Sequence, residues 1–237
     1  FSIPIFKNVS QKHGVPVPSQ NFVRETFGDL IVTMTRILKF KPMFVFLLAY
    51  FLYIDGVNTV INMSTAYGAA LGLDASGMII ALLVTQIVAF PCAIFFGRMS
   101  QKFGALNMII FAICVYLVIC VIGFSMGMGL ESGWLSIANG TTLFFVLAAL
   151  VGTVQGGIQA ISRSYFGKMV PPENAGEYFG FFDIFGKFAA FLGPLLYSMT
   201  KAITGRSSLS IFSIVVLFFG ALVVFYAGRK YLKNNPE

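Results

Sequence analysis

Charged residues are scarce in this sequence and make up 11% of its 237 residues. Ordinary soluble domains carry about 25% charged residues, so the composition excludes that class of protein. Hydrophobic residues instead reach 57%, and the mean hydropathy is +0.85. We therefore interpret the chain as an integral membrane protein.

Residues that support catalysis or metal binding are also few, with one His and three Cys. Cys92, Cys114 and Cys120 lie in apolar runs without CxxC spacing, which is typical of packing residues. No Ser/His, paired-Asp or His-cluster pattern stands out along the sequence. The sequence thus predicts neither an enzyme nor a bound cofactor. The formal charge of +7 indicates basic loops at a membrane surface, not nucleic-acid binding.

Apolar runs long enough to cross a membrane follow one another along the chain. A helix needs about 20 apolar residues to span the hydrocarbon core, and six segments reach that length. We expect membrane-spanning helices at 43–67, 76–97, 105–127, 141–165, 175–202 and 208–231. The fold class that follows is all-α, with six transmembrane helices.

Basic residues lie mainly on one side of these spans. That side holds Lys7, Lys12, Arg24, Arg36, Lys39, Lys41, Arg98, Lys102, Arg163, Lys168, Arg229, Lys230 and Lys233. The opposite side has only Lys201 and Arg206. Because cytoplasmic loops are enriched in Lys and Arg, we expect both termini in the cytoplasm.

Residues 1–41 differ from the rest and are expected to form a cytoplasmic linker before a six-helix domain at 42–237. Within 22–41, apolar residues recur on one helical face and charged residues lie largely elsewhere. An amphipathic helix of this kind lies along the membrane surface. Since the sequence begins at Phe1 without Met or a signal peptide, we expect it to be part of a longer protein.

Polar side chains nevertheless occur inside four of the spans, where offsets of three, four and seven residues place several on one helical face. They include Asp55, Asn58 and Asn62 in the first span, Gln86 in the second, and Gln155 and Gln159 in the fourth. Such residues either bind helices together or line a water-filled cavity. Because the spans at 105–127 and 208–231 carry almost none, we favour a cavity surrounded by the other four.

The fifth span contains FFDIFGKFAAFLGP at 181–194, with Asp183 and Lys187 one helical turn apart. An isolated charge at mid-bilayer costs about 2.5 to 3.5 kcal/mol on insertion scales. The two residues either neutralise each other as an intrahelical ion pair or face a watery substrate path shared with Asp55. Both interpretations stay open.

A second polar group lies where the fourth span ends and the fifth begins. Here Arg163 and Glu177 flank Pro171 and Pro172. One hypothesis is that Arg163 closes onto Glu177 as a cytoplasmic gate. The other is that Glu177 only stabilises the first turn of its helix, where the dipole favours carboxylates.

The loop GRMSQKFGA at 97–105 resembles the degenerate second copy of the Gly-x-x-x-Asp-Arg-x-Gly-Arg loop of the major facilitator superfamily. Gln101 replaces the acid of that loop and Ala105 its last base. Three longer stretches resemble the C-terminal half of the vacuolar amino-acid effluxer-like branch, known from autophagy-related yeast vacuole proteins and bacterial homologues. They are FLLAYFLYIDGVNTV (46–60), QGGIQAISRSYFGKMVPP (155–172) and GEYFGFFDIFGKFAAFLGP (176–194).

This resemblance implies twelve helices in two six-helix halves around a central cavity with alternating access. FSIPIFK would end the preceding helix, and residues 8–41 would link the halves. The spans at 43–67 and 141–165 would be cavity-lining gate helices. Those at 76–97 and 175–202 would also face the cavity, and the remaining two would face lipid.

We therefore expect the C-terminal half of a secondary transporter in a bacterial cell inner membrane. It would move a small polar solute, with amino-acid efflux as the specific hypothesis, and pair with a missing N-terminal half or a second copy of itself. Asp55 is assigned to proton coupling or a substrate ammonium, and Lys187 to a substrate carboxylate or to Asp183. The alternative is a non-transporting membrane scaffold whose polar helix faces bind a partner.

Overall fold

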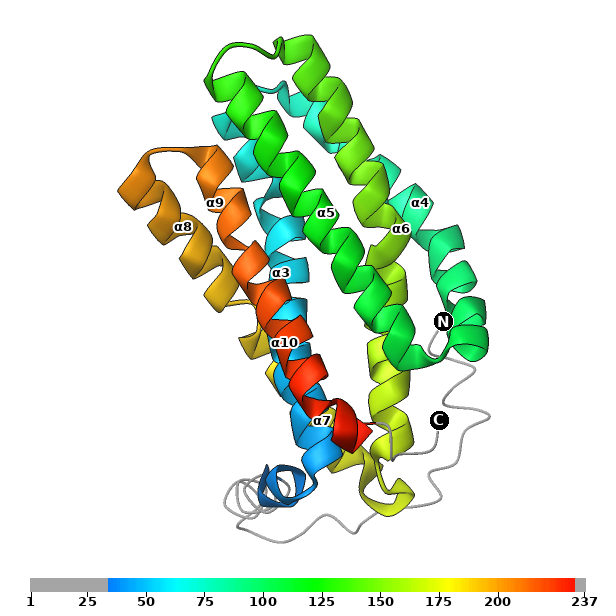
Figure 1. Ribbon diagram of the computed structural model, residues 1–237. Helices are drawn as coiled ribbons and strands as arrows, with labels where there is room; N and C mark the ends of the chain where they lie inside the picture. Colours follow the sequence, from blue (N-terminus) through cyan, green and yellow to red (C-terminus); the bar gives the residue numbers. More distant parts are fainter. Residues whose placement is uncertain (1–33, 233–237) are drawn as a thin grey trace, which may run out of the picture.

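The computed structural model describes residues 34–232, which fold into one bundle of helices (Figure 1). Its elements are α3 (Lys41–Ala70), α4 (Ala75–Phe103), α5 (Ala105–Glu131), α6 (Ile137–Met169), the 3₁₀-helix η1 (Pro172–Asn174), α7 (Ala175–Phe188), α8 (Leu192–Thr204), α9 (Ser207–Ser213) and α10 (Val215–Leu232). The all-α prediction is confirmed.

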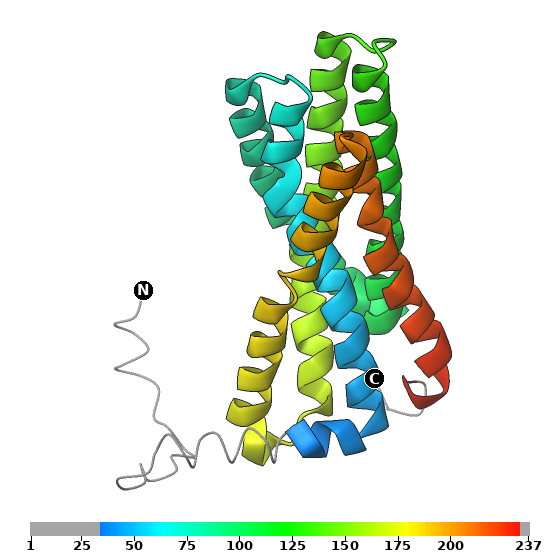
Figure 2. The ribbon, with the colours of Figure 1, turned by 90° about the vertical axis from the view of Figure 1, so that its left-hand side faces the viewer.

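Most of the expected linker and amphipathic helix lies outside the described residues. Residues 34–39 are helical and lie at a steep angle to the start of α3 (Figure 2). Their placement on a membrane surface, and the domain boundary at 41–42, stay predictions.

Among residues 34–232, six helical segments are long and apolar enough to cross a membrane, which confirms the six expected spans. The fifth and sixth spans are each built from more than one helix. The fifth is interrupted between Phe188 and Leu192, and the sixth at Ile214.

Both interruptions have a local cause. Pro194 has no N–H, and its ring would clash with the carbonyl of residue 190 in a continuous helix, so α8 starts afresh at Leu192. At Ile214 the backbone N–H bonds to the Ile211 carbonyl, three residues back, at 3.3 Å. This is a short 3₁₀ step within the span.

The connections define two ends of the bundle (Figure 1). The α3–α4, α5–α6 and α8–α9 turns lie at one end, which we call the distal end. The starts of α3 and α7 and the end of α10 lie at the other, the terminal end. Asp74 caps α4 at the distal end by accepting the Gly77 N–H at 3.0 Å, a common way to satisfy the first turn of a helix.

Helix α3 runs through the middle of the bundle and packs against α6, α7, α8 and α10. Figures 1 and 2 agree that α5 and α10 lie on one side of α3, and that α4 and α7 lie on the other. The two spans with few polar residues therefore share one side of the bundle.

Helices α4 and α6 pack closely along their length, with glycines of α6 against α4. A Cβ added to Gly152 would lie 2.7 Å from the Thr85 carbonyl oxygen, and one on Gly156 would lie 3.1 Å from Ala93 Cβ. Membrane helices lack a hydrophobic drive to associate, so close approach at small residues supplies much of their packing energy.

We predict that Gly152→Ala lowers the stability of the full-length protein in detergent by about 1 to 3 kcal/mol, because the new methyl group overpacks the α4–α6 contact. Gly97→Ala on α4 is the matched control, since a Cβ there meets nothing within 4 Å. Thermal unfolding should show a lower melting temperature for Gly152→Ala alone. Equal melting temperatures would contradict the close α4–α6 approach.

Candidate functional site

Asp55 lies at the middle of α3, and its side chain is fully buried, with 0% exposure. Its carboxylate faces the start of α8, where the Gly193 backbone N–H donates to Oδ1 at 3.0 Å and to Oδ2 at 2.9 Å. A carboxylate at a helix N-terminus is stabilised by the unpaired N–H groups and the positive end of the helix dipole. Asp55 thus caps a helix that begins inside a membrane span.

The close approach of α8 to α3 requires glycine at position 193. A Cβ there would overlap the Thr59 hydroxyl oxygen and lie 2.8 Å from Thr59 Cβ. Thr59 is itself fully buried and donates its hydroxyl proton to the Asp55 backbone carbonyl at 2.7 Å. In this conformation the Asp55 side chain has no solvent-exposed surface, and its expected role in proton coupling or ammonium binding stays a prediction.

Arg163 of α6 and Asp183 of α7 form an ion pair, with Nη1 2.7 Å from Oδ1. The two side chains are 54% and 51% exposed. The Arg163 guanidinium carbon also lies 5.0 Å from the centre of the Phe179 ring, a cation–π distance. Phe179 and Asp183 are four residues apart and share one face of α7, so this face meets α6.

This pairing differs from both ion pairs considered from the sequence. Arg163 pairs with Asp183, and Glu177 lies on a different face of α7 from Phe179 and Asp183. The ion-pair partner of Asp183 is thus Arg163 on the neighbouring helix α6, and not Lys187 on its own helix. Lys187 forms no ion pair with any residue in the described range 34–232. The gate role of Arg163 and Glu177 stays a prediction.

Aromatic side chains fill the terminal half of the contact between α3, α6 and α7. The Tyr50 and Phe182 rings stack with centroids 4.3 Å apart, and Phe166 stacks on Phe182 at 4.7 Å. Tyr53 is fully buried, and its hydroxyl oxygen lies 2.6 Å from the Ser162 hydroxyl oxygen, a hydrogen-bond distance. The sequence analysis missed this cluster, although aromatic residues at offsets of four and seven in α3 were a signal for it.

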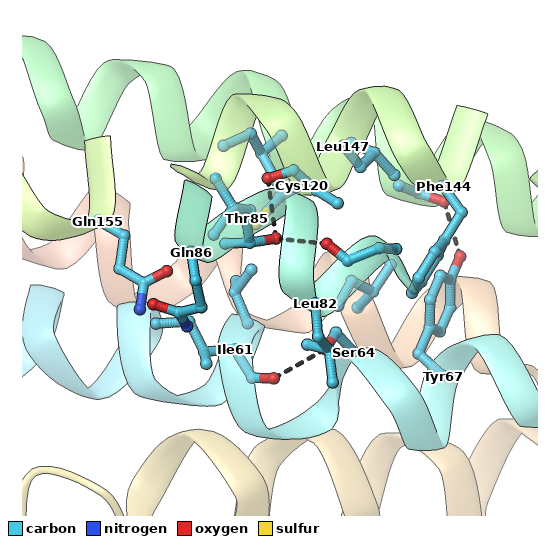
Figure 3. A pocket seen from close by; sticks show the side chains of 17 residues that line it. Ile61, Ser64, Tyr67, Leu82, Thr85, Gln86, Cys120, Phe144, Leu147 and Gln155 are labelled. Atoms are coloured by element: carbon cyan, nitrogen blue, oxygen red, sulfur yellow. Dashed lines mark hydrogen bonds between the residues drawn. The ribbon is translucent and has the colours of Figure 1, made fainter. Parts of the chain in front are cut away.

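A cavity of about 70 Å³ lies in the distal half, between α3, α4, α5 and α6, with Ile211 of α9 also in its lining. Its polar lining consists of Ser64, Tyr67, Thr85, Gln86 and Gln155, and Figure 3 shows the two glutamines at the same end. Tyr67 donates to the Gly123 carbonyl at 2.6 Å. This volume holds a few water molecules, whereas pockets for small organic ligands measure about 300 to 1,000 Å³.

Gln155 differs from the other polar residues of the cavity. Its side-chain oxygen is buried and has no hydrogen-bond partner among the described residues. Such a group is destabilising by about 1 to 3 kcal/mol unless a water or ligand donates to it. Gln86 and Gln155 thus line the same cavity, and their expected role in solute binding stays a prediction.

The other predicted residues do not join a single site. Asn58 is half-buried, whereas Asn62, Gln159 and Lys187 are exposed. Within the part of the chain that the structure describes, no group of three His, Cys, Asp or Glu side chains could hold a metal ion. The polar groups thus lie at three places: Arg163–Asp183, Asp55–Gly193, and the Gln86–Gln155 cavity.

Comparison with known proteins identifies the family. A family model described as vacuole effluxer Atg22 like matches residues 1–229. The chain belongs to this Atg22-like family. No solved structure matches the chain.

Individual relatives of the Atg22-like family come from bacteria and fungi. The uncharacterized MFS-type transporter YxiO of Bacillus subtilis is 44% identical over 224 residues, which cover 94% of this chain and 49% of that protein. Autophagy-related protein 22 of Coccidioides immitis is 25% identical over 228 residues, covering 87% of this chain and 36% of the relative. The chain therefore spans about half, or less, of the relatives it matches, and the resemblance drawn from the sequence is confirmed.

We predict that exchanging the charges of the pair restores stability that either single change removes. The Arg163→Asp variant places two carboxylates side by side, and the Asp183→Arg variant places two guanidinium groups side by side. Each variant should lower the free energy of unfolding by about 1 kcal/mol, the upper end of the range for exposed ion pairs. The double variant should return to within about 0.5 kcal/mol of the original protein, a limit typical of additive sites. Thermal unfolding measures this, with Lys187→Ala as a control that removes a charge outside the pair without adding a carboxylate. Additive losses in the double variant would contradict the contact.

Proposed function

We propose that this chain supplies one six-helix half of a major-facilitator-type secondary transporter, which moves a small polar solute by alternating access. The specific hypothesis is outward transport of amino acids. The family description, vacuole effluxer, and the transporter name of the Bacillus subtilis relative support this proposal.

The observation that carries the proposal is the position of Lys187. It lies at the middle of the span Pro172–Thr204, is exposed, and pairs with no carboxylate among residues 34–232. An ammonium group in contact with lipid at this depth is costly, so such residues face a bundle interior or a watery cavity. A carboxylate on the solute would neutralise it there.

The remaining polar positions fit the same arrangement. Exposed amides on α3, α4 and α6, namely Asn62, Gln86 and Gln159, would donate and accept hydrogen bonds across a cavity completed by a second half. The low-polarity spans α5 and α9–α10 would face lipid. The rival interpretation, a scaffold, uses the same exposed faces for a partner protein and predicts no flux.

The orientation of the bundle in the membrane is also part of the proposal. We propose a bacterial inner membrane with the terminal end in the cytoplasm, supported by the excess of Lys and Arg at that end. Lipid surrounds the bundle, and the second half would come from the remainder of a longer protein or from a second copy of this chain.

We predict that Lys187→Ala reduces amino-acid flux at least tenfold in proteoliposomes containing the full-length protein, because the proposed partner of the solute carboxylate is lost. Lys168→Ala, at the end of α6, is the matched control and should transport normally. Radiolabelled amino acids, sugars and short peptides form the solute panel. Absence of flux for every solute, with both variants as well folded as the original, would favour the scaffold.

We also predict that an impermeant thiol reagent labels Ser132→Cys on intact cells, but labels Glu173→Cys only after the membrane is opened. Both positions are exposed: Ser132 lies in the α5–α6 turn and Glu173 in η1, between α6 and α7. These two connections lie at opposite ends of the bundle (Figure 1). Each cysteine is introduced singly in a variant without native cysteines. The reverse pattern would place the terminal end outside the cytoplasm.

A further inference from the structure

A buried amide oxygen faces the cavity between α3, α4, α5 and α6 without a hydrogen-bond partner. It belongs to Gln155 of α6. Two other buried side-chain oxygens among residues 34–232 also have no partner, on Tyr116 and Tyr197, but neither residue lines the cavity. A buried acceptor left unpaired destabilises a fold, and native structures generally supply a donor to it. The Gln155 oxygen therefore marks a place where a hydrogen-bond donor is expected.

The hydroxyl groups of the cavity do not supply this donor. Ser64, Tyr67 and Thr85 donate their hydroxyl protons to backbone carbonyl oxygens at distances of 2.6 to 3.1 Å. Gln86 of α4 lies at the same end of the cavity as Gln155 (Figure 3), and its side chain is exposed. The two amides thus form a polar mouth through which a donor can reach the buried oxygen.

The size of the cavity limits what that donor can be. A volume of about 70 Å³ holds a few water molecules and is too small for a whole organic solute. A primary ammonium group is close to a water molecule in size and carries three N–H donors. Water and the ammonium end of a larger solute are therefore the two groups that fit.

The carboxylates that lie away from the ends of the spans are engaged elsewhere in the described part of the chain. Asp55 accepts the Gly193 N–H and has no exposed surface. Asp183 pairs with Arg163 at 2.7 Å. An ammonium entering the bundle in this conformation therefore meets neutral acceptors, and hydrogen bonds from a charged donor to such acceptors are stronger than those from a neutral donor.

We propose that the amide oxygens of Gln155 and Gln86 bind the ammonium group of the solute at the mouth of this cavity, which holds water when no solute is bound. The body of the solute stays on the open face, and only its ammonium enters. This inference rests on the transport function proposed above and narrows its solute class to primary amines.

The depth of this site suits a solute whose carboxylate meets Lys187. At about 1.5 Å per residue, Gln155 lies about 21 Å along α6 from Met169, and Lys187 lies about 18 Å along α7 from Ala175. Met169 and Ala175 end and begin their helices at the terminal end of the bundle (Figure 1). The ammonium site and the ammonium of Lys187 are therefore at similar depths, where one zwitterion can use both.

The test compares L-alanine with propionate, which has the same carboxylate but no ammonium. Binding to the full-length protein is measured as the rise in melting temperature with probe concentration. We expect alanine to bind at least about tenfold more tightly than propionate, because a site built around a hydrogen-bonding group rejects an analogue without it. In Gln155→Met, which keeps the side-chain length but lacks the acceptor, this preference should fall below about twofold while propionate binding is unchanged.

Matched variants test whether the effect belongs to this pair of amides. Gln86→Met should reduce the preference for alanine in the same direction. Gln101→Met, at an exposed glutamine near the end of the same helix α4, should leave it unchanged. Equal binding of the two probes by the original protein, absence of binding included, overturns the inference. An unchanged preference in folded Gln155→Met overturns it as well.

A second measurement needs no variant. Cys120 lines the cavity and is fully buried, so hydroxyl radicals from pulsed radiolysis should oxidise it only where water occupies the cavity. Met126, also buried but outside the cavity lining, is the reference. Alanine should protect Cys120 and propionate should not. Oxidation of Cys120 that alanine leaves unchanged means that the site holds water only, which overturns the inference.

The outcome is distinguishable from that of the transport assay. Amino-acid flux with the same preference for ammonium-bearing solutes in Gln155→Met overturns this inference alone. A preference for alanine that depends on Gln155, in a protein without flux, supports the ammonium site and counts against the proposed transport instead.

Discussion

The contact between Asp55 and Gly193 solves two problems that neither side could solve alone. A carboxylate at the centre of a membrane span lacks water to stabilise it, and a helix that begins inside the membrane leaves N–H groups without partners. In this bundle the two lie against each other, with both carboxylate oxygens within 3.0 Å of one backbone nitrogen. The break in the fifth span and the acid in the first span are therefore parts of one feature.

Close contact at glycine makes this feature geometrically feasible. Helix α3 touches α8 at Gly193 and α10 at Gly56, where a Cβ would lie 2.8 Å from the Phe218 ring. Because α3 lies between its neighbours (Figure 2), small residues on both sides set how near they come. Dispersion contacts over these short distances replace the hydrophobic drive that soluble bundles use.

The sequence was sufficient to predict the six spans, but it was not sufficient to predict the interruptions within the fifth and sixth of them. Hydropathy is summed over about 20 residues, so a three-residue interruption such as 189–191 barely changes it. The Gly193–Pro194 pair was the available signal, and it was outweighed by the apolar run around it. The partner of Arg163 was beyond prediction for another reason, because it depends on how α6 and α7 are rotated about their axes, which spacing within one helix does not determine.

The depth of each polar group is the physical reason for proposing a second set of helices beside this bundle. The Arg163–Asp183 pair lies near the terminal end, where long side chains reach the interface, and Asp55 accepts the Gly193 N–H at the start of α8. Lys187 lies at the middle of its span, next to the interruption after Phe188, and its side chain is exposed. It has neither an ion-pair partner among residues 34–232 nor a position near the membrane interface. The 70 Å³ cavity is too small to hold a solute for it. In the transport function proposed above, water or an anion would neutralise this ammonium on the open face of α7, and a second set of helices would enclose it away from lipid.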